Sequence, residues 1–145
     1  MEPSAVRRMF ISRIAIGVAV IATPAHVIAA DGAALYAEHC AACHGVNLEG
    51  EADWRIQNED GSMRAPPHDD SGHTWHHPDQ MLHDYTRLGG AETLRRMGVT
   101  GVNSAMPAFG DLMSDQEIDA VLGFIKSNWS PRMRDHQRMI TEASQ

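Results

Sequence analysis

Two cysteines, the only two in the 145-residue chain, lie three positions apart and are followed at once by a histidine. The run is Cys40-Ala41-Ala42-Cys43-His44. On one helical turn, two thiols at this spacing can both reach the edge of a flat macrocycle and add to its two vinyl groups, while the next imidazole turns under the ring. The spacing therefore predicts one covalently attached haem c, held by Cys40 and Cys43, with His44 as the proximal iron ligand.

Other uses of a cysteine pair fit this sequence less well. A structural zinc site needs about four ligands, and no second cysteine pair exists to complete one. A thioredoxin-like redox pair needs a strand-helix-strand frame, whereas the flanking sequence is alanine-rich and helical in character. A disulfide between these two positions would close a loop too short to remove much entropy from the unfolded chain. Haem attachment is the interpretation that remains.

Residues 1–29 have the pattern of a secretory signal peptide. Three arginines precede the uncharged run 14–22, and small residues at Ala29 and Ala30 offer a cleavage site. The run is about half the ~20 residues that span a bilayer, so an uncleaved membrane anchor is the lesser alternative. Because covalent haem attachment takes place outside the bacterial cytoplasm, this segment and the cysteine motif together predict a periplasmic protein.

Charge and length limit the partners and the number of domains. Removal of the signal leaves about 115 residues, enough for one small domain over residues 30–130 and a polar tail over 131–145. The whole chain has a net charge of −7, but the signal holds three arginines and Glu2, so the remainder has nine basic and eighteen acidic residues. A charge of −9 disfavours nucleic acid and anionic lipid, and favours a redox donor and acceptor with basic docking patches.

Helical patterns flank one long irregular stretch. Asp31 can cap a first helix that runs through the cysteine motif and ends at Gly45. Residues 46–77 hold five Gly and Pro residues among many polar groups, which predicts a loop, and a loop this long is expected to cover a face of the haem. A second helix is expected to have Pro78 in its first turn and to end before Gly89, with a shorter helical piece over 91–97.

The last predicted helix has the clearest boundaries. Ser114 and Glu117 form a capping box at its start, and Pro131 ends the run. One face is apolar, and we expect it to pack on Leu35 and Tyr36 of the first helix. The residues of that face and its neighbours are Ile118, Val121, Leu122, Phe124, Ile125 and Trp129. The tail beyond it is either a short extra helix or a frayed end.

The sixth position on the iron separates electron transfer from ligand binding, because a thioether fills it and an open site takes up small molecules. Met106 lies in a loop over residues 98–110, directly before the last helix. An unbranched thioether followed by Pro107, which stiffens the backbone, suits a distal ligand opposite His44. Met113 is the main rival for this role. Met81 and Met97 are expected in the core.

The ordered combination of these residues resembles the class I c-type cytochromes, in their small bacterial periplasmic monohaem form. The matching stretches are Leu35-Tyr36, Cys40 to Gly45, Met106-Pro107-Ala108-Phe109, and Leu112 with 114–126. The resemblance implies an all-α cytochrome c fold in which the N- and C-terminal helices cross around one haem. It also implies electron transfer without enzymatic activity.

A second stretch, Pro66-Pro67-His68 with 72–77, looks similar to some bacterial members of the same class. By this analogy, the carbonyl of Pro66 or of Pro67 accepts a hydrogen bond from His44 and fixes its ring. Five histidines fall within sixteen residues here and could bind copper or zinc, or could be solvated loop residues or partners of the haem carboxylates. They are His68, His73, His76, His77 and His83.

The sequence thus predicts a periplasmic electron carrier whose haem iron is held by His44 and Met106. The alternative is a haem-bearing subunit of a larger membrane or periplasmic oxidoreductase complex. A ligand-binding haem sensor is the third possibility, and it requires an iron site that Met106 leaves open.

Overall fold

The computed structural model describes residues 30–145, and the predicted signal peptide lies outside that range. No helix between residues 30 and 145 combines the length and the apolar character needed to cross a bilayer. In chain order the elements are α1 (Gly32–His39), α2 (Ala41–His44), β1 (Ser62–Met63), the 3-10 turn η1 (Thr74–His76), α3 (Asp79–Leu88), α4 (Gly90–Arg96), β2 (Asn103–Ser104), α5 (Asp115–Ser127) and α6 (Pro131–Ala143).

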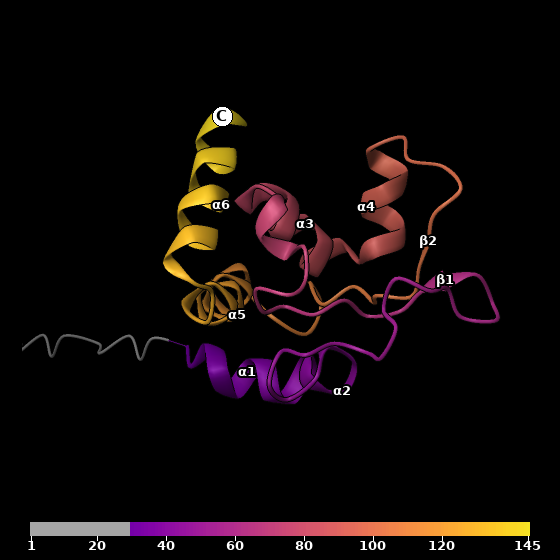
Figure 1. Ribbon diagram of the computed structural model, residues 1–145, viewed down its shortest axis with the longest axis horizontal. Helices are drawn as coiled ribbons and strands as arrows, with labels where there is room; N and C mark the ends of the chain where they lie inside the picture. The colour runs from indigo at the N-terminus through magenta and orange to yellow at the C-terminus, as the bar shows by residue number, and fades with distance from the viewer. Residues whose placement is uncertain (1–29) are drawn as a thin grey trace, which may run out of the picture.

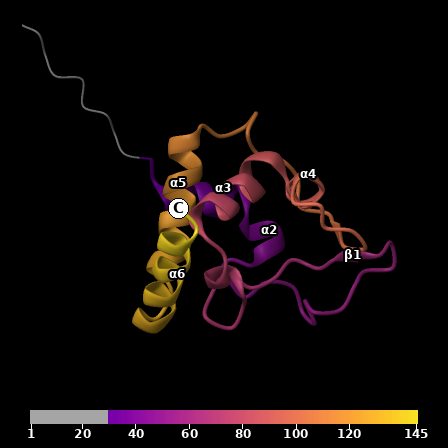
Figure 2. The same ribbon diagram turned by 90° about the horizontal axis from the view of Figure 1, so that it is seen from above.

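The first and fifth helices cross, as the resemblance implies. In Figure 1, α1 runs across the view beneath α5, which is seen nearly end-on, and α3 and α6 lie above α5. Figure 2 shows α4 and β1 on the side of the molecule away from α5 and α6. The predicted all-α fold is confirmed: the two short strands contribute one parallel pair of two residues each.

The α1–α5 crossing forms the centre of the core. Ile118 of α5 is fully buried, and Tyr36 of α1 is 2% exposed. The rings of Tyr36 and Phe124 lie 5.3 Å apart between centroids. Close approach of the two backbones requires Gly32, because a methyl group there would overlap the carbonyl of Ala120 in α5.

Gly32→Ala is therefore expected to destabilise the protein by about 1–3 kcal/mol, the usual cost of overpacking a tight contact. Gly123→Ala is the matched control, since Gly123 lies in the interior of α5 with open space around it. That change should stabilise by about 1 kcal/mol through helix propensity alone. Thermal unfolding of the two variants measures both effects. A Gly32→Ala variant as stable as Gly123→Ala would show that the crossing does not depend on a residue without a side chain.

The helix ends differ from the sequence prediction in small, explicable ways. Asp31 caps α1 by accepting from the backbone of Ala33 and Ala34, but the helix is interrupted at Cys40 before α2. Pro78 is the residue before α3 rather than part of its first turn. The capping box of Ser114 is present, yet α5 ends at Ser127. Trp129 lies past that end and is nevertheless 2% exposed, so its burial does not come from the helical face.

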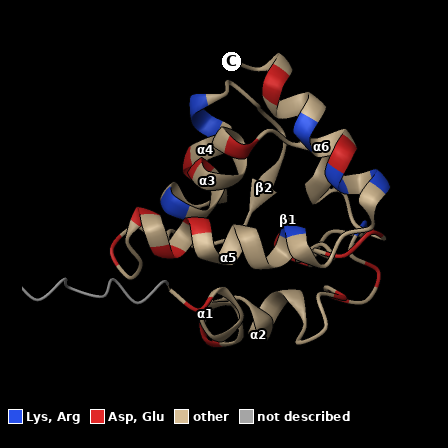
Figure 3. Cartoon of the chain, turned by 90° about the vertical axis from the view of Figure 1, so that its left-hand side faces the viewer, with Lys and Arg blue, Asp and Glu red and all other residues tan. Residues whose placement is uncertain are grey.

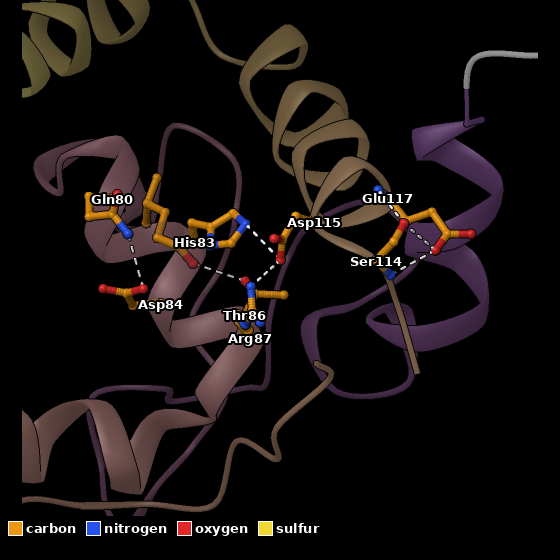
Figure 4. A network of polar contacts seen from close by, with 9 residues as sticks. Gln80, His83, Asp84, Thr86, Arg87, Ser114, Asp115 and Glu117 are labelled. Atoms are coloured by element: carbon orange, nitrogen blue, oxygen red, sulfur yellow. Dashed lines mark hydrogen bonds and ion pairs between the residues drawn. The ribbon is translucent and has the colours of Figure 1, made fainter. Parts of the chain in front are cut away.

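Contacts between charged and polar side chains connect α3 with the start of α5. Figure 4 shows His83 and Arg87 of α3 directed at Asp115, next to the capping pair of Ser114 and Glu117. Arg87 Nη1 lies 2.5 Å from Asp115 Oδ1, and His83 Nε2 lies 3.7 Å from the same oxygen. The Arg87 and Asp115 side chains are exposed to solvent, so their ion pair contributes little to stability.

The C-terminal tail is a helix. Ser130 caps α6 by accepting from Met133 N, and Pro131 occupies the first turn, where its missing N–H has no cost. Figure 1 shows α6 standing beside α3 and above α5. Gln137 of α6 is 5% exposed, so the helix is docked by a buried polar side chain rather than frayed.

Candidate haem-binding site

The short helix α2 presents the cysteine motif. Cys40 is buried at the junction of α1 and α2, Cys43 is exposed, and both are free thiols. Burial, and secondarily the charge of Cys43, raise the pKa of Cys40 to about 11. Gly45 ends α2 with φ +82°, a conformation that favours glycine, and Tyr36 Oη donates to its carbonyl at 3.0 Å.

The geometry of His44 fits a proximal ligand. Its side chain is buried, and Nδ1 lies 2.8 Å from the carbonyl oxygen of Pro66. Because a carbonyl can only accept, Nδ1 carries the proton and the lone pair of Nε2 is left for a metal. Burial lowers the pKa of His44 against the opposing effects of Pro66 and Glu51, so the neutral ring is favoured. Of the two prolines predicted as partners, the structure selects Pro66.

Backbone hydrogen bonds attach the loop that contains Met106 to the end of α3 and the start of α4. Gly90 N donates to Met106 O at 3.0 Å, and Phe109 N donates to Thr86 O at 3.0 Å. A side chain at Gly89 would come within 2.9 Å of Ala108 N, so the loop lies directly on that turn. The Met106 side chain packs against the buried cluster that includes Cys40. Its role as distal ligand stays a prediction.

The two strands tie the proximal loop to the Met106 loop. Ser62 pairs with Asn103 and Met63 with Ser104 in parallel register. Pro66 follows β1 by three residues and Met106 follows β2 by two. The carbonyl that orients His44 and the predicted distal methionine therefore lie in segments that leave two paired strands, which the sequence did not indicate.

The other methionines differ in how far they are exposed. Met113 is 4% exposed and belongs to the core, whereas Met97 is 52% exposed. The expectation that Met97 is a core residue is wrong, because it lies just past the end of α4 before Gly98. Met81 is half-buried on α3.

The histidine-rich loop forms stacked rings rather than a metal site. Within residues 30–145, no three His, Cys, Asp or Glu side chains come together in a way that could hold a metal ion. The ring of His73 stacks on Trp54 and that of His76 on Trp75, with centroids 5.3 and 3.8 Å apart. Arg55 lies 4.1 Å above the Trp54 ring.

Two polar atoms in this loop are buried without a partner: Nδ1 of His73 and Nε1 of Trp75. Buried polar atoms almost always form hydrogen bonds. Trp75 Nε1 can only donate, so its burial indicates a missing acceptor, and His73 Nδ1 can donate to one in one of its tautomers. A haem carries two carboxylates, which would supply one. Together with the free thiols and the oriented His44, this observation shows that the site fits a haem.

Comparison with protein families agrees with this geometry. A family model described as cytochrome c oxidase, cbb3-type, subunit III matches residues 28–125, more than half of the chain. The chain belongs to this family. No curated protein and no solved structure matches the chain significantly. Membership in the cbb3-type subunit III family confirms the resemblance to class I c-type cytochromes, and implies one covalently bound haem c and haem-based electron transfer.

The family match ends inside α5 and leaves out the C-terminal segment. Residues 126–145 comprise the end of α5, Trp129 and all of α6. These residues nevertheless contact the haem-binding part. Trp129 Nε1 donates to the carbonyl of His68 at 2.7 Å, and Gln137 Nε2 donates to the carbonyl of His77 at 3.2 Å. Sequence reasoning missed this connection, since a polar amphipathic tail gives no indication of where it docks.

Proposed function

We propose that this protein is a periplasmic one-electron carrier whose haem is attached to Cys40 and Cys43 and whose iron is held by His44 and Met106. The observation that carries the proposal is the hydrogen bond from His44 Nδ1 to Pro66, which leaves Nε2 available for the iron. When bound, the haem supplies a ferrous-ferric couple that accepts and releases one electron. The protein itself makes and breaks no substrate bond.

The residues of the chain suit a carrier better than a ligand-binding sensor. The Met106 loop is fixed by backbone hydrogen bonds to Thr86 and Gly90, and the proximal ring by Pro66. Ligands held from rigid segments move little when the charge on the metal changes, which favours rapid electron transfer. A filled sixth position also excludes small molecules from the iron.

The surface near the motif suits contact with another protein. Cys43 is exposed and Val46 is 75% exposed, so the edge of the site faces solvent. Figure 3 shows that α2 carries no charged residue, whereas acidic and basic residues are spread over α3 to α6. We infer that the attached haem edge meets a redox partner at this uncharged rim, and that the −9 charge of residues 30–145 attracts a basic docking patch.

Association with a basic redox partner should therefore slow as ionic strength rises. The Debye length falls from ~10 Å at 0.1 M salt to ~3 Å at 1 M, which screens the attraction between opposite charges. Stopped-flow mixing of the reduced protein with an oxidised basic redox protein measures the second-order rate constant. An acidic redox protein of similar potential is the control, and its rate should rise with salt. Rates independent of salt for both would show that charge does not steer docking.

The alternative is that the protein works as a haem-bearing subunit of a membrane oxidoreductase, as the family description indicates for other members. Fractionation of the native source separates the two roles. A carrier is released with the periplasmic fluid as a small species, whereas a subunit stays with the membrane and elutes with its partners after mild solubilisation.

A further inference from the structure

His68 differs from the other histidines of its loop because its ring contacts His44. Its imidazole stacks on that of His44, with ring centroids 3.9 Å apart and planes 20° from parallel. The hydrogen bond that His44 donates to the Pro66 carbonyl holds the ring at Nδ1 only. That bond acts at one edge of the ring, whereas a flat group packed against the face of the ring opposes its tilting toward that side. The contact with His68 therefore supplies what Pro66 does not.

Three hydrogen bonds hold His68 itself in place. Its ring Nδ1 lies 2.9 Å from Thr74 Oγ1, and its backbone N donates to Leu48 O at 2.8 Å. Its carbonyl accepts from Trp129 Nε1 at 2.7 Å. Thr74, Leu48 and Trp129 are all buried. The position and the tilt of the His68 ring are thus fixed from the loop, from the segment after α2 and from the C-terminal segment.

The C-terminal segment forms hydrogen bonds along residues 68–79 and not only with His68. Ser130 N donates to Asp70 Oδ1 at 2.9 Å, and Asp79 N donates to Thr141 Oγ1 at 3.1 Å. Gln137 bridges the carbonyl of His77 to Asp79. These contacts come from residues beyond the family match, so this support is a property of this chain rather than of the matched domain.

We propose that His68 is a positioning residue for His44, fixing the plane of its imidazole by stacking, and that Thr74 and Trp129 hold it there. The proposal rests on the proposed role of His44 as an iron ligand. The plane of an axial imidazole sets how unpaired spin is distributed over the macrocycle of a ferric haem. The positions of the paramagnetically shifted haem-methyl resonances therefore respond to the orientation of His44, together with that of the other axial ligand, and a loss of stability alone does not rearrange them.

The test compares His68→Ala with His68→Phe in the haem-loaded protein by proton NMR of the ferric state. His68→Ala should change the spread and the order of the haem-methyl resonances, because the His44 ring gains rotational freedom. His68→Phe should retain a pattern close to wild type, because a flat ring still stacks. His76→Ala is the matched control: it removes an exposed imidazole of the same loop that stacks on Trp75 and not on His44, and it should change nothing.

A wild-type methyl pattern in His68→Ala, with only a lower melting temperature, would overturn the proposal. So would a His68→Phe pattern displaced as far as that of the alanine variant. If His68→Ala does not fold, His68→Asn keeps a polar side chain at this position but has no ring to stack on His44, and an unshifted pattern there counts against the proposal equally. The proposed function fails on a separate observation, namely a wild-type ferric protein that is not six-coordinate and low-spin.

Discussion

Replacing both Cys40 and Cys43 with serine will leave a protein from which acid and acetone extract all of the haem. The wild type should retain it, because thioether bonds survive conditions that break every metal-ligand bond. Either single variant keeps one thioether bond, so its attachment is reduced to a single covalent link that should still resist extraction. The measurement is the haem absorbance that remains with the precipitated polypeptide.

Met106→Ala is the control for this experiment, since it alters the proposed axial ligation and leaves both thiols in place. Its haem should stay with the polypeptide. Free extraction of haem from the wild type would contradict covalent attachment, and with it the role assigned to α2.

Met106→Ala has a second expected result, which concerns the iron itself. The ferric protein should lose the sulfur-to-iron charge-transfer band in the near infrared, and the protein should bind carbon monoxide or cyanide readily. Replacement by histidine should instead lower the reduction potential, because imidazole is a stronger donor than a thioether and favours ferric iron. Spectra of the ferric protein and a redox titration measure the two effects.

Met113→Ala is the matched control, because Met113 lies in the core at 4% exposure. It should keep the band and lose about 2–5 kcal/mol of stability, the usual cost of emptying such a position. Loss of the band in Met113→Ala and not in Met106→Ala would make Met113 the ligand, and the cytochrome assignment would remain. A wild type that lacks the band and binds carbon monoxide would instead favour a ligand-binding haem protein.

Local sequence patterns were sufficient to predict the features that depend on residues close together in the chain. The Asp31 cap, the capping box at Ser114 and the glycine at position 45 each act within one helical turn, so the residues themselves specify these ends. The cysteine motif belongs to the same class, because its chemistry depends on spacing along α2. The apolar face of α5 also predicted its packing on α1, and Tyr36 and Ile118 lie in one buried cluster.

Contacts between distant segments could not be read from the sequence. The parallel pairing of β1 with β2 joins residues about forty positions apart, and neither two-residue strand has a pattern of its own. Met97 was expected in the core from its helical spacing but lies past the end of α4, where its side chain is 52% exposed. Spacing along a helix fixes the face that a side chain occupies, and the tertiary structure decides whether that face is covered.

The sequence by itself determined which residues can hold a haem, because Cys40, Cys43 and His44 lie within one turn and their chemistry is local. The resemblance to class I cytochromes offered the carbonyl of Pro66 or Pro67 as the partner of His44, and only the tertiary structure decided between the two and added the contact with His68. Its carbonyl partner Pro66 and the stacked ring of His68 arrive from a loop, and that loop is held by a C-terminal helix about sixty residues further along the chain. Hydrogen bonds between such segments depend on where the backbone passes, which no residue pattern encodes.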